Sequence, residues 1–221
     1  MIKILEENKS FIVLLKPEGY SVHNQSPSVA EYLKKAKKPV HFVNRLDQET
    51  SGLMIIAKTP ELHAILAESL ENGQKFYRAL LRGSWTKPEK NLLWSWPITD
   101  KAEGRQNPKG ISADRQEAQT KIQVLRTNKF FTEVFIELLT GRQHQIRKHA
   151  AIALHAVVGD PRYSDKKYND GIAKIYNVKR MHLHAEKLIF TFENKPYTFE
   201  AKLSLDDFFK PAPPTPPNSN S

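Results

Sequence analysis

The stretch HFVNRLDQETSG, residues 41–52, ends an apolar run with a charged segment and a turn of small residues. Asp47 follows the apolar run, which we expect to be a strand. Thr50 lies in a turn whose N–H and O–H groups can hold a carboxylate. An isolated Asp in such a place is usually a turn residue. It can also be a nucleophile held at the rim of a sheet, and the remaining sequence has to separate these two interpretations.

Composition and charge restrict the class of protein. The chain has 221 residues, which suits one large domain or two closely packed halves. Lys and Arg number 34 against 24 Asp and Glu, and the formal net charge of +10 favours a polyanionic partner such as nucleic acid. The absence of cysteine excludes disulfides, thiolate catalysis and cysteine-based zinc sites. We see no secretory signal and no apolar run long enough to span a bilayer, so we expect a cytoplasmic protein with no membrane partner.

The hydrophobic pattern predicts an α+β protein, because strand-like runs outnumber helical patterns and the two are interspersed. Ser28 and Glu31 have the spacing of a capping box, and Thr59 can cap a second helix with Pro60 in its first turn. We expect residues 1–210 to form one domain and the Pro-rich residues 211–221 to be disordered or extended. Strands are expected at 2–5, 11–15, 53–57, 75–81, 120–125, 130–139, 182–192 and 197–203, and helices at about 28–35, 60–72 and 142–153.

The segment LLTGRQHQIRKHAAIALHAVVGDPRY, residues 138–163, is rich in potentially cationic side chains. In a helix over 142–153, His144 and Arg147 lie one turn apart and share a face, whereas Ile146 belongs to an apolar face that can pack on a sheet. A cationic side at a helix N-terminus suits a phosphate-rich ligand. Arg147 could also pair with Asp47, keep it ionised and orient it. The cationic set is Arg142, His144, Arg147 and His149.

Residues 101–115 predict a mobile basic loop, because glycine and proline interrupt a polar segment. We expect this loop to contribute phosphate contacts and to close over a bound ligand. An ordinary surface loop is the alternative interpretation. The basic residues of the segment are Lys101, Arg105, Lys109 and Arg115.

A metal site is a competing hypothesis for the histidines. His144 and His149 are five residues apart, not the four that place two ligands on one helix face. His182 and His184 lie two apart on one face of a predicted strand. Because no acidic residue joins either pair at a familiar spacing, we expect no metal and interpret these histidines as structural or RNA-contacting.

Several segments, in the same order along the chain, resemble the motifs of the RluA-type pseudouridine synthases. NRLDQETSG, residues 44–52, is similar to the family signature HRLDxxTSG. Further similar segments are KPEGYSVH (16–23), KFYRALLRG (75–83), TGRQHQIRKH (140–149) with GDPRY (159–163), and LHAEKLIF (183–190). The resemblance covers nearly the whole chain. It implies a mixed, mainly antiparallel sheet in two halves flanked by helices, with a cleft between the halves and Asp47 in its floor. Many relatives carry an N-terminal domain of the S4 type, for which we expect no room before the KPEG segment.

The resemblance also implies roles for matching positions. Asp47 would be the catalytic aspartate, Arg147 its ion-pair partner, and Tyr77 the ring that stacks on the target uracil and assists the final deprotonation. Ile146 would line the pocket beneath the base, and Arg45 would hold or replace the flipped nucleotide. Further RNA contacts are expected from Thr50, Arg142 and His144. The chain departs from the family pattern at Asn44, Leu154 and Ala156, which puts in question the RNA contacts near the signature and the chain path before residue 159.

The implied function is the isomerisation of specific uridines in structured ribosomal or transfer RNA, by a monomer that needs no cofactor and no obligatory protein partner. The carboxylate of Asp47 could attack C1′ or C6, or assist removal of a sugar proton, and the sequence leaves these three routes open. Two other classes of protein also stay open. A catalytically silent RNA-binding module would share the charge without needing Asp47, Arg147 and Tyr77 together, and a metal-dependent nuclease or hydrolase would use the histidines.

Overall fold

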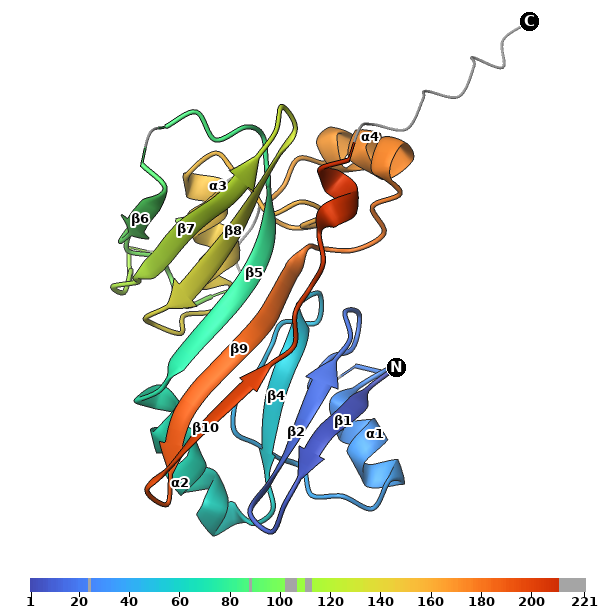
Figure 1. The fold of residues 1–221 in the computed structure, drawn as a ribbon, viewed down its shortest axis with the longest axis vertical. Helices are drawn as coiled ribbons and strands as arrows, with labels where there is room; N and C mark the ends of the chain where they lie inside the picture. The colour runs from blue at the N-terminus through green and yellow to red at the C-terminus, as the bar shows by residue number, and fades with distance from the viewer. Residues whose placement is uncertain (24, 88, 102–106, 110–112, 211–221) are drawn as a thin grey trace, which may run out of the picture.

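The strands of the protein form one sheet in the order β1-β2-β4-β9-β5-β8-β7-β6, with β3 pairing β4 and β10 pairing β9 outside this path (Figure 1). The structure, a computed structural model, describes residues 1–210 except 24, 88, 102–106 and 110–112. The strands are β1 (Lys3–Glu7), β2 (Phe11–Lys16), β3 (His41–Phe42), β4 (Ser51–Ala57), β5 (Gln74–Arg82), β6 (Asn91–Trp94), β7 (Thr120–Thr127), β8 (Phe131–Leu138), β9 (Leu183–Phe192) and β10 (Lys195–Glu200). The helices are α1 (Val29–Lys35), α2 (Pro60–Glu71), α3 (Gln145–Ile152) and α4 (Lys166–Tyr176), followed by a 3₁₀ turn at Asp206–Phe208.

The two halves of the sheet meet at β4 and β9. These two strands run parallel and pair only through Ser51 with His184 and Gly52 with Ala185, whereas the other strand pairs of the described residues are antiparallel. Gly52 has a φ of 131°, and a Cβ atom there would lie 2.4 Å from the backbone N and O of Ala185. Only glycine fits this approach. The mixed, mainly antiparallel sheet expected from the sequence is confirmed.

Helices cover both faces of the sheet, and the local signals expected for them are present. Ser28 caps α1 in a complete capping box, and Thr59 caps α2 with Pro60 in its first turn. Buried apolar side chains of α1 and α2 pack into two separate clusters on β2 and β4, of which the α2 cluster also includes residues of β9, and Ile146 of α3 packs into a third cluster. Tyr77 on β5 packs against both the α1 cluster and the α3 cluster. Tyr77 therefore lies where the two halves meet.

Helix α3 begins later than the sequence predicted. It starts at Gln145 rather than Arg142, and His144 precedes it with a left-handed φ of 56°. The side-chain oxygen of Gln145 accepts hydrogen bonds from the hydroxyl of Thr140, at 2.7 Å, and from the N–H of Arg142, at 3.1 Å. These bonds hold the preceding residues in a turn. His144 and Arg147 are therefore not one turn apart in a helix, although both still point toward Asp47.

Two further elements differ from the expectation. The strand before Asp47, β3, has only two residues, so Asp47 lies in a loop well beyond its end. Helix α4 was not predicted, because its eleven residues contain Gly171 and several charged side chains. Its N-terminal cap, Asp165, accepts a hydrogen bond from the N–H of Tyr168. Because Ile172 alone of its side chains is buried, tertiary packing rather than a continuous apolar face stabilises this helix.

Candidate active site

The structure brings Asp47 and Arg147 together, although they are 100 residues apart in the chain. The Nη1 atom of Arg147 donates to Oδ2 of Asp47 at 3.0 Å. The Arg147 side chain is 1% exposed and that of Asp47 is 26% exposed. The result is a solvent-accessible carboxylate held from behind by a buried cation, which is an arrangement typical of functional carboxylates.

Arg147 contacts two further carboxylates, which the sequence interpretation had not included. Asp160 accepts from Nε at 2.8 Å and from Nη2 at 2.9 Å, so that it binds one edge of the guanidinium in a two-pronged arrangement. Glu49 accepts from Nη1 at 3.2 Å, beside Asp47. Burial acts to lower the pKa of Arg147, but its hydrogen bonds to Asp160 and the charges of all three carboxylates outweigh it and raise the pKa. Arg147 is therefore a permanent cation at the centre of the site.

The segment that follows residue 156 encloses Arg147 from another side. The Tyr163 ring lies 5.4 Å from the guanidinium carbon, within the range of a cation–π contact. The Tyr163 hydroxyl is 3.1 Å from Nδ1 of His144, whose Nε2 lies 3.7 Å from Oδ1 of Asp47. Burial lowers the pKa of His144, against the attraction of Asp47. At neutral pH His144 is therefore a neutral ring able to donate or accept one hydrogen bond beside the carboxylate.

The loop that carries Asp47 is fixed by a buried lysine. The Nζ atom of Lys16, whose side chain is fully buried, donates to the carbonyls of Pro17, Tyr20 and Gln48 at 3.0, 2.7 and 3.1 Å. The N–H of Gly19 also donates to the Gln48 carbonyl, at 2.8 Å. Burial lowers the pKa of Lys16 to about 8, although nearby carboxylates, Asp47 among them, act in the opposite direction. The KPEG segment and the Asp47 loop are thus one hydrogen-bonded unit.

Tyr77 is partly buried and lies near Asp47. Burial, and then the negative charge of Asp47, raise the pKa of its hydroxyl well above the ordinary value. The phenol is therefore protonated at any physiological pH. Ile146, 5% exposed, packs into the same cluster as Tyr77. The ring and the isoleucine together provide an apolar wall beside a carboxylate.

The turn after Asp47 forms a hydrogen bond with the backbone of Asp47 and not with its side chain. We had expected the N–H and O–H groups of this turn to hold the carboxylate. Instead, the N–H of Thr50 donates to the backbone carbonyl of Asp47 at 3.1 Å, and Thr50 is buried. Arg147, not the turn, holds the side chain of Asp47.

The other predicted RNA contacts are spread around the site. Arg45 is exposed, and Arg142 is partly exposed and donates to the Glu117 carbonyl at 3.3 Å. Lys101, Lys109 and Arg115 are exposed, whereas Arg105 and much of its predicted mobile loop lie outside the described residues. The Lys101 carbonyl accepts from the buried Nζ of Lys148 at 2.7 Å, and the Lys109 carbonyl accepts from the N–H of Thr99. The described ends of the basic loop are thus tied to the fold close to α3.

Two of the four histidines of the metal hypothesis, His149 and His184, are hydrogen-bonded within the fold. Both ring nitrogens of His149 contact protein oxygens, of Thr120 and Trp96, and both of His184 do so with Ser51 and Ala201. Burial lowers the pKa of His182 to about 4. Across the part of the chain that the structure describes, no three His, Asp or Glu residues gather in a way that could hold a metal ion.

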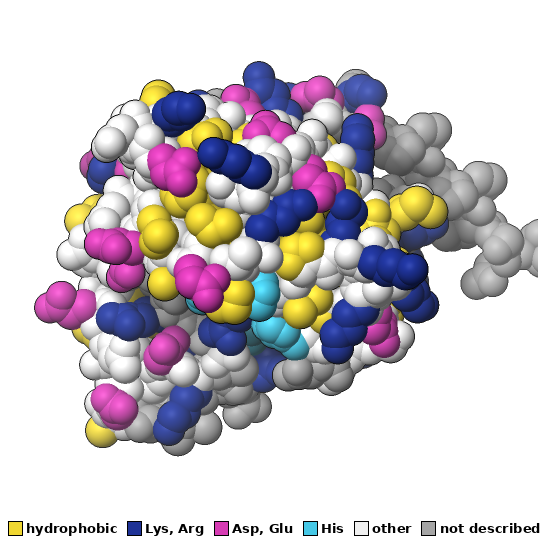
Figure 2. All heavy atoms as spheres, turned by 90° about the horizontal axis from the view of Figure 1, so that it is seen from below, with side chains coloured by type: hydrophobic (Ala, Val, Ile, Leu, Met, Phe, Trp, Pro, Cys, Tyr) yellow, Lys and Arg dark blue, Asp and Glu magenta, His cyan; other side chains and the backbone are white. Residues whose placement is uncertain are grey.

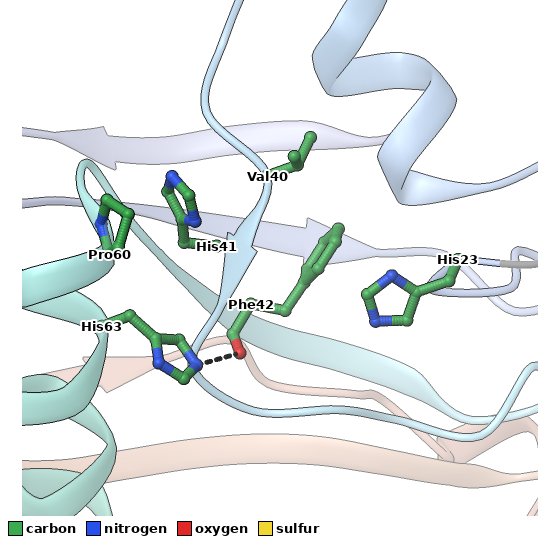
Figure 3. A pocket seen from close by; sticks show the side chains of 6 residues that line it. All are labelled: His23, Val40, His41, Phe42, Pro60 and His63. Carbon is green, nitrogen blue, oxygen red and sulfur yellow. Dashed lines mark hydrogen bonds between the residues drawn. The ribbon is translucent and has the colours of Figure 1, made fainter.

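Figure 2 shows histidine side chains at the surface of the face seen from below, among both basic and acidic residues. A separate pocket has a volume of about 370 Å³. In Figure 3 the ring of His63 points to the Phe42 carbonyl, 3.1 Å from its Nε2. The pocket is lined by His23, Val40, His41, Phe42, Pro60 and His63. None of the predicted site residues lines it, so it is distinct from the Asp47 site.

Two of the three departures from the family pattern, Asn44 and Leu154, lie away from the carboxylate of Asp47. Asn44 accepts from the N–H of Ile55 at 2.8 Å and donates to the Leu53 carbonyl at 3.2 Å, so it attaches the Asp47 loop to β4. Leu154, in the place of the usual glycine, has a left-handed φ of 64° and is 86% exposed. Such a conformation costs a leucine about 1 kcal/mol, which an exposed side chain does not recover by packing. Neither departure changes the groups around Asp47.

Comparison with known proteins finds several that resemble this chain. The model of the family described as "RNA pseudouridylate synthase" matches residues 10–152. The "Ribosomal large subunit pseudouridine synthase C" of Salmonella typhimurium is 32% identical over 216 residues, covering 94% of this chain and 67% of that protein. An RNA pseudouridine synthase of Zymomonas mobilis is 35% identical over 214 residues, covering 91% of this chain and 93% of that protein. The structure titled "Human RNA Pseudouridylate Synthase Domain Containing 1" has the same fold, with a TM-score of 0.75 at 21% identity over 95% of this chain and 93% of that one.

No helix among the described residues is long and apolar enough to cross a membrane.

Proposed function

The chain belongs to the RNA pseudouridylate synthase family and is an isomerase that acts on RNA, and from this premise we propose that it converts specific uridines of ribosomal RNA to pseudouridine with Asp47 as the essential group. The observation that carries the proposal is the partly exposed carboxylate of Asp47, held by buried Arg147 beside the ring of Tyr77. The choice of ribosomal RNA follows from the names of the large-subunit synthases that resemble the chain.

The reaction needs few groups, and each has a candidate in the site. The N1–C1′ bond of uridine breaks, the uracil turns, C5 joins C1′, and the proton on C5 is lost while N1 gains one, so substrate and product are isomers. Asp47 supplies a carboxylate that attacks C1′ or C6 or removes a sugar proton. The target base has to leave its stack to reach it, and Tyr77 offers a ring on which the base can stack. Because the pKa of Tyr77 is raised, its hydroxyl serves better as a hydrogen-bond donor than as the base that removes the C5 proton.

RNA contacts around the site are assigned to basic and polar side chains. We propose that His144 and Arg45 contact the nucleotides next to the target, and that Lys101, Arg105, Lys109, Arg115 and Arg142 contact phosphates. Residues 1–210 act as one catalytic unit, as a monomer in the cytoplasm. The histidines used inside the fold argue against the hydrolase alternative, and the Asp47–Arg147–Tyr77 grouping argues against a silent binding module.

The test is to map pseudouridine in total RNA from cells with and without the protein. Loss of one or a few ribosomal positions, restored by the wild-type chain but not by Asp47→Asn, is the expected result. Loss confined to transfer RNA would contradict the choice of substrate. Restoration by Asp47→Asn would contradict the role of the carboxylate.

A further inference from the structure

We propose that Asp160 is a positioning residue that fixes the guanidinium of Arg147 and thereby aims its Nη1 atom at Asp47, an inference that rests on the proposed role of Asp47. Asp160 follows the left-handed Gly159 in the GDPRY segment, and it is fully buried. It does not reach the reacting carboxylate directly in this geometry. Its influence passes through Arg147.

The geometry of the guanidinium explains how this works. The group is planar, and its donors point in fixed directions. Asp160 occupies the Nε–Nη2 edge with bonds of 2.8 and 2.9 Å, which fixes the plane and the rotation of the group. The Nη1 atom then points away from Asp160, toward Asp47 at 3.0 Å and Glu49 at 3.2 Å. A single bond from Nη1 to a partly exposed carboxylate would not fix the plane in this way.

Asp160 is itself held rigidly. Its Oδ1 atom accepts from the N–H groups of Arg162 and Tyr163 at 2.8 and 3.1 Å. Its carbonyl accepts from the side chain of Asn169 on α4 at 2.9 Å. A Cβ atom on Gly159 would lie 2.1 Å from the Arg180 carbonyl, so only glycine allows the backbone before Asp160 to pack this closely. Helix α4 therefore supports the catalytic carboxylate through a continuous series of hydrogen bonds.

A second arginine provides an internal control. Arg78 donates from Nε and Nη2 to Glu186 at 2.9 and 2.6 Å, and from Nη1 to Glu133 at 3.0 Å. Arg78 follows Tyr77 on β5, and successive side chains of a strand point to opposite faces, so this group lies on the other face of the sheet. Glu186 thus has the contacts of Asp160 without a connection to Asp47. The variant Glu186→Gln therefore measures how much the loss of a comparable ion pair lowers the stability of the fold, without a direct effect on Asp47.

The deciding experiment uses Asp160→Asn and Glu186→Gln. An asparagine that keeps its oxygen at the Oδ1 position can still accept from the two backbone N–H groups and from Nη2, but its NH₂ group faces Nε, donor against donor. Single-turnover rates at saturating enzyme are measured per folded molecule, together with RNA affinity. We expect Asp160→Asn to lower the rate about 10- to 100-fold, as for a small misplacement of a catalytic group, with affinity changed by less than about threefold. Glu186→Gln is expected to lower the melting temperature and to keep the wild-type rate.

A double variant sharpens the test if Asp160→Asn folds, and Asn169→Ala keeps the proposal testable if it does not. Combining Asp160→Asn with Arg147→Lys should cost less than the product of the separate losses, because both act through one guanidinium. Asn169→Ala removes only the bond to the Asp160 carbonyl and should lower the rate a few-fold at unchanged affinity. A wild-type rate in a folded Asp160→Asn protein, or in Asn169→Ala if the former is unfolded, overturns the proposal. An active Asp47→Asn protein would overturn the proposed function instead.

Discussion

Two arginines in this protein have the same arrangement of partners, but their carboxylate partners differ in exposure to solvent. In the Arg78 cluster, Glu186 binds one edge of the guanidinium and Glu133 accepts from Nη1. Glu133 also accepts from Arg126 at 2.5 Å, and its side chain is 7% exposed. Every carboxylate in this cluster is thus satisfied by the protein and closed to solvent.

The Arg147 cluster, made of Arg147, Asp160, Asp47 and Glu49, differs in one respect. Its edge-binding carboxylate, Asp160, is as buried as Glu186, but the carboxylates on Nη1 are open, with Asp47 26% and Glu49 36% exposed. A buried ion pair contributes little net stability once its desolvation is counted. Under the proposed function, the accessibility of the carboxylates on Nη1, rather than the presence of an ion pair, distinguishes the Arg147 cluster from a structural contact.

The largest contrast is expected between Asp47→Asn and Glu133→Gln. Both remove one charge from Nη1 of an arginine. Asp47→Asn should leave less than about one-hundredth of the rate, a loss of ~3 kcal/mol or more in barrier stabilisation, with fold and RNA affinity nearly intact. Glu133→Gln should destabilise the fold by roughly 3–5 kcal/mol, because it leaves buried charges unpaired, and keep the rate per folded molecule. Single-turnover kinetics and thermal unfolding of both variants decide. Equal effects of both variants on the rate would contradict the proposed difference in role between the Arg147 cluster and the Arg78 cluster.

Arg147→Lys and Arg78→Lys form the next pair. Lysine keeps the charge but lacks the planar fork, so it cannot serve both edges of the group. We expect Arg147→Lys to lower the rate by roughly 10- to 100-fold, and Arg78→Lys to change stability only. Single-turnover kinetics and thermal unfolding of both variants check this expectation. A wild-type rate in Arg147→Lys would show that charge alone suffices at this position.

Tyr77 and Arg78 are neighbours on β5 that belong to opposite faces, so Tyr77→Phe and Tyr77→Leu test the face of the sheet that carries the Asp47 site. If the ring stacks on the uracil, Tyr77→Phe should stay within about threefold of wild type, whereas Tyr77→Leu should lose about 1–3 kcal/mol of binding or rate. A loss of the rate in Tyr77→Phe as large as in Tyr77→Leu would assign the essential function to the hydroxyl. Titration of the RNA substrate against each variant measures the affinity, and single-turnover kinetics measure the rate.

The smallest effect is expected from the basic loop, which belongs to neither cluster. Replacing Lys101, Arg105, Lys109 and Arg115 by Ala should weaken RNA binding. Each lost phosphate contact should lower the slope of log affinity against log salt by roughly 0.7 to 0.9. The rate at saturating enzyme should change little. An unchanged salt slope would mean that these side chains face solvent in the complex.

Local signals in the sequence were sufficient for several elements. The capping box at Ser28 and the Pro60 helix start involve residues within one turn of each other, so no tertiary information is needed to recognise them. The apolar face of α3 was recognisable from its spacing in the same way. The start of α3 was not, because the side chain of Gln145 closes a turn that competes with the first helical residues.

Partners distant in the chain could not be read from spacing. Arg147 was expected beside Asp47, but its two-pronged partner is Asp160, which depends on the turn at Gly159 and on support from α4. The role of Lys16 likewise depends on three carbonyls that converge only in the folded chain. The place of Lys16 at the start of the KPEGYSVH segment was the one sequence signal that could have pointed to this role.

The two halves of the sheet pair along only a short stretch, at the junction of β4 and β9. Two residue pairs carry the parallel contact, and the backbone of Gly52 lies against that of Ala185 with no space for a methyl group. Asp47 lies five residues before Gly52 in the chain, whereas Arg147 and Tyr77 come from the other half. A side chain at position 52 would therefore act as a wedge, and the separation of the halves would be felt first as a lengthened distance between Asp47 and the groups that hold it.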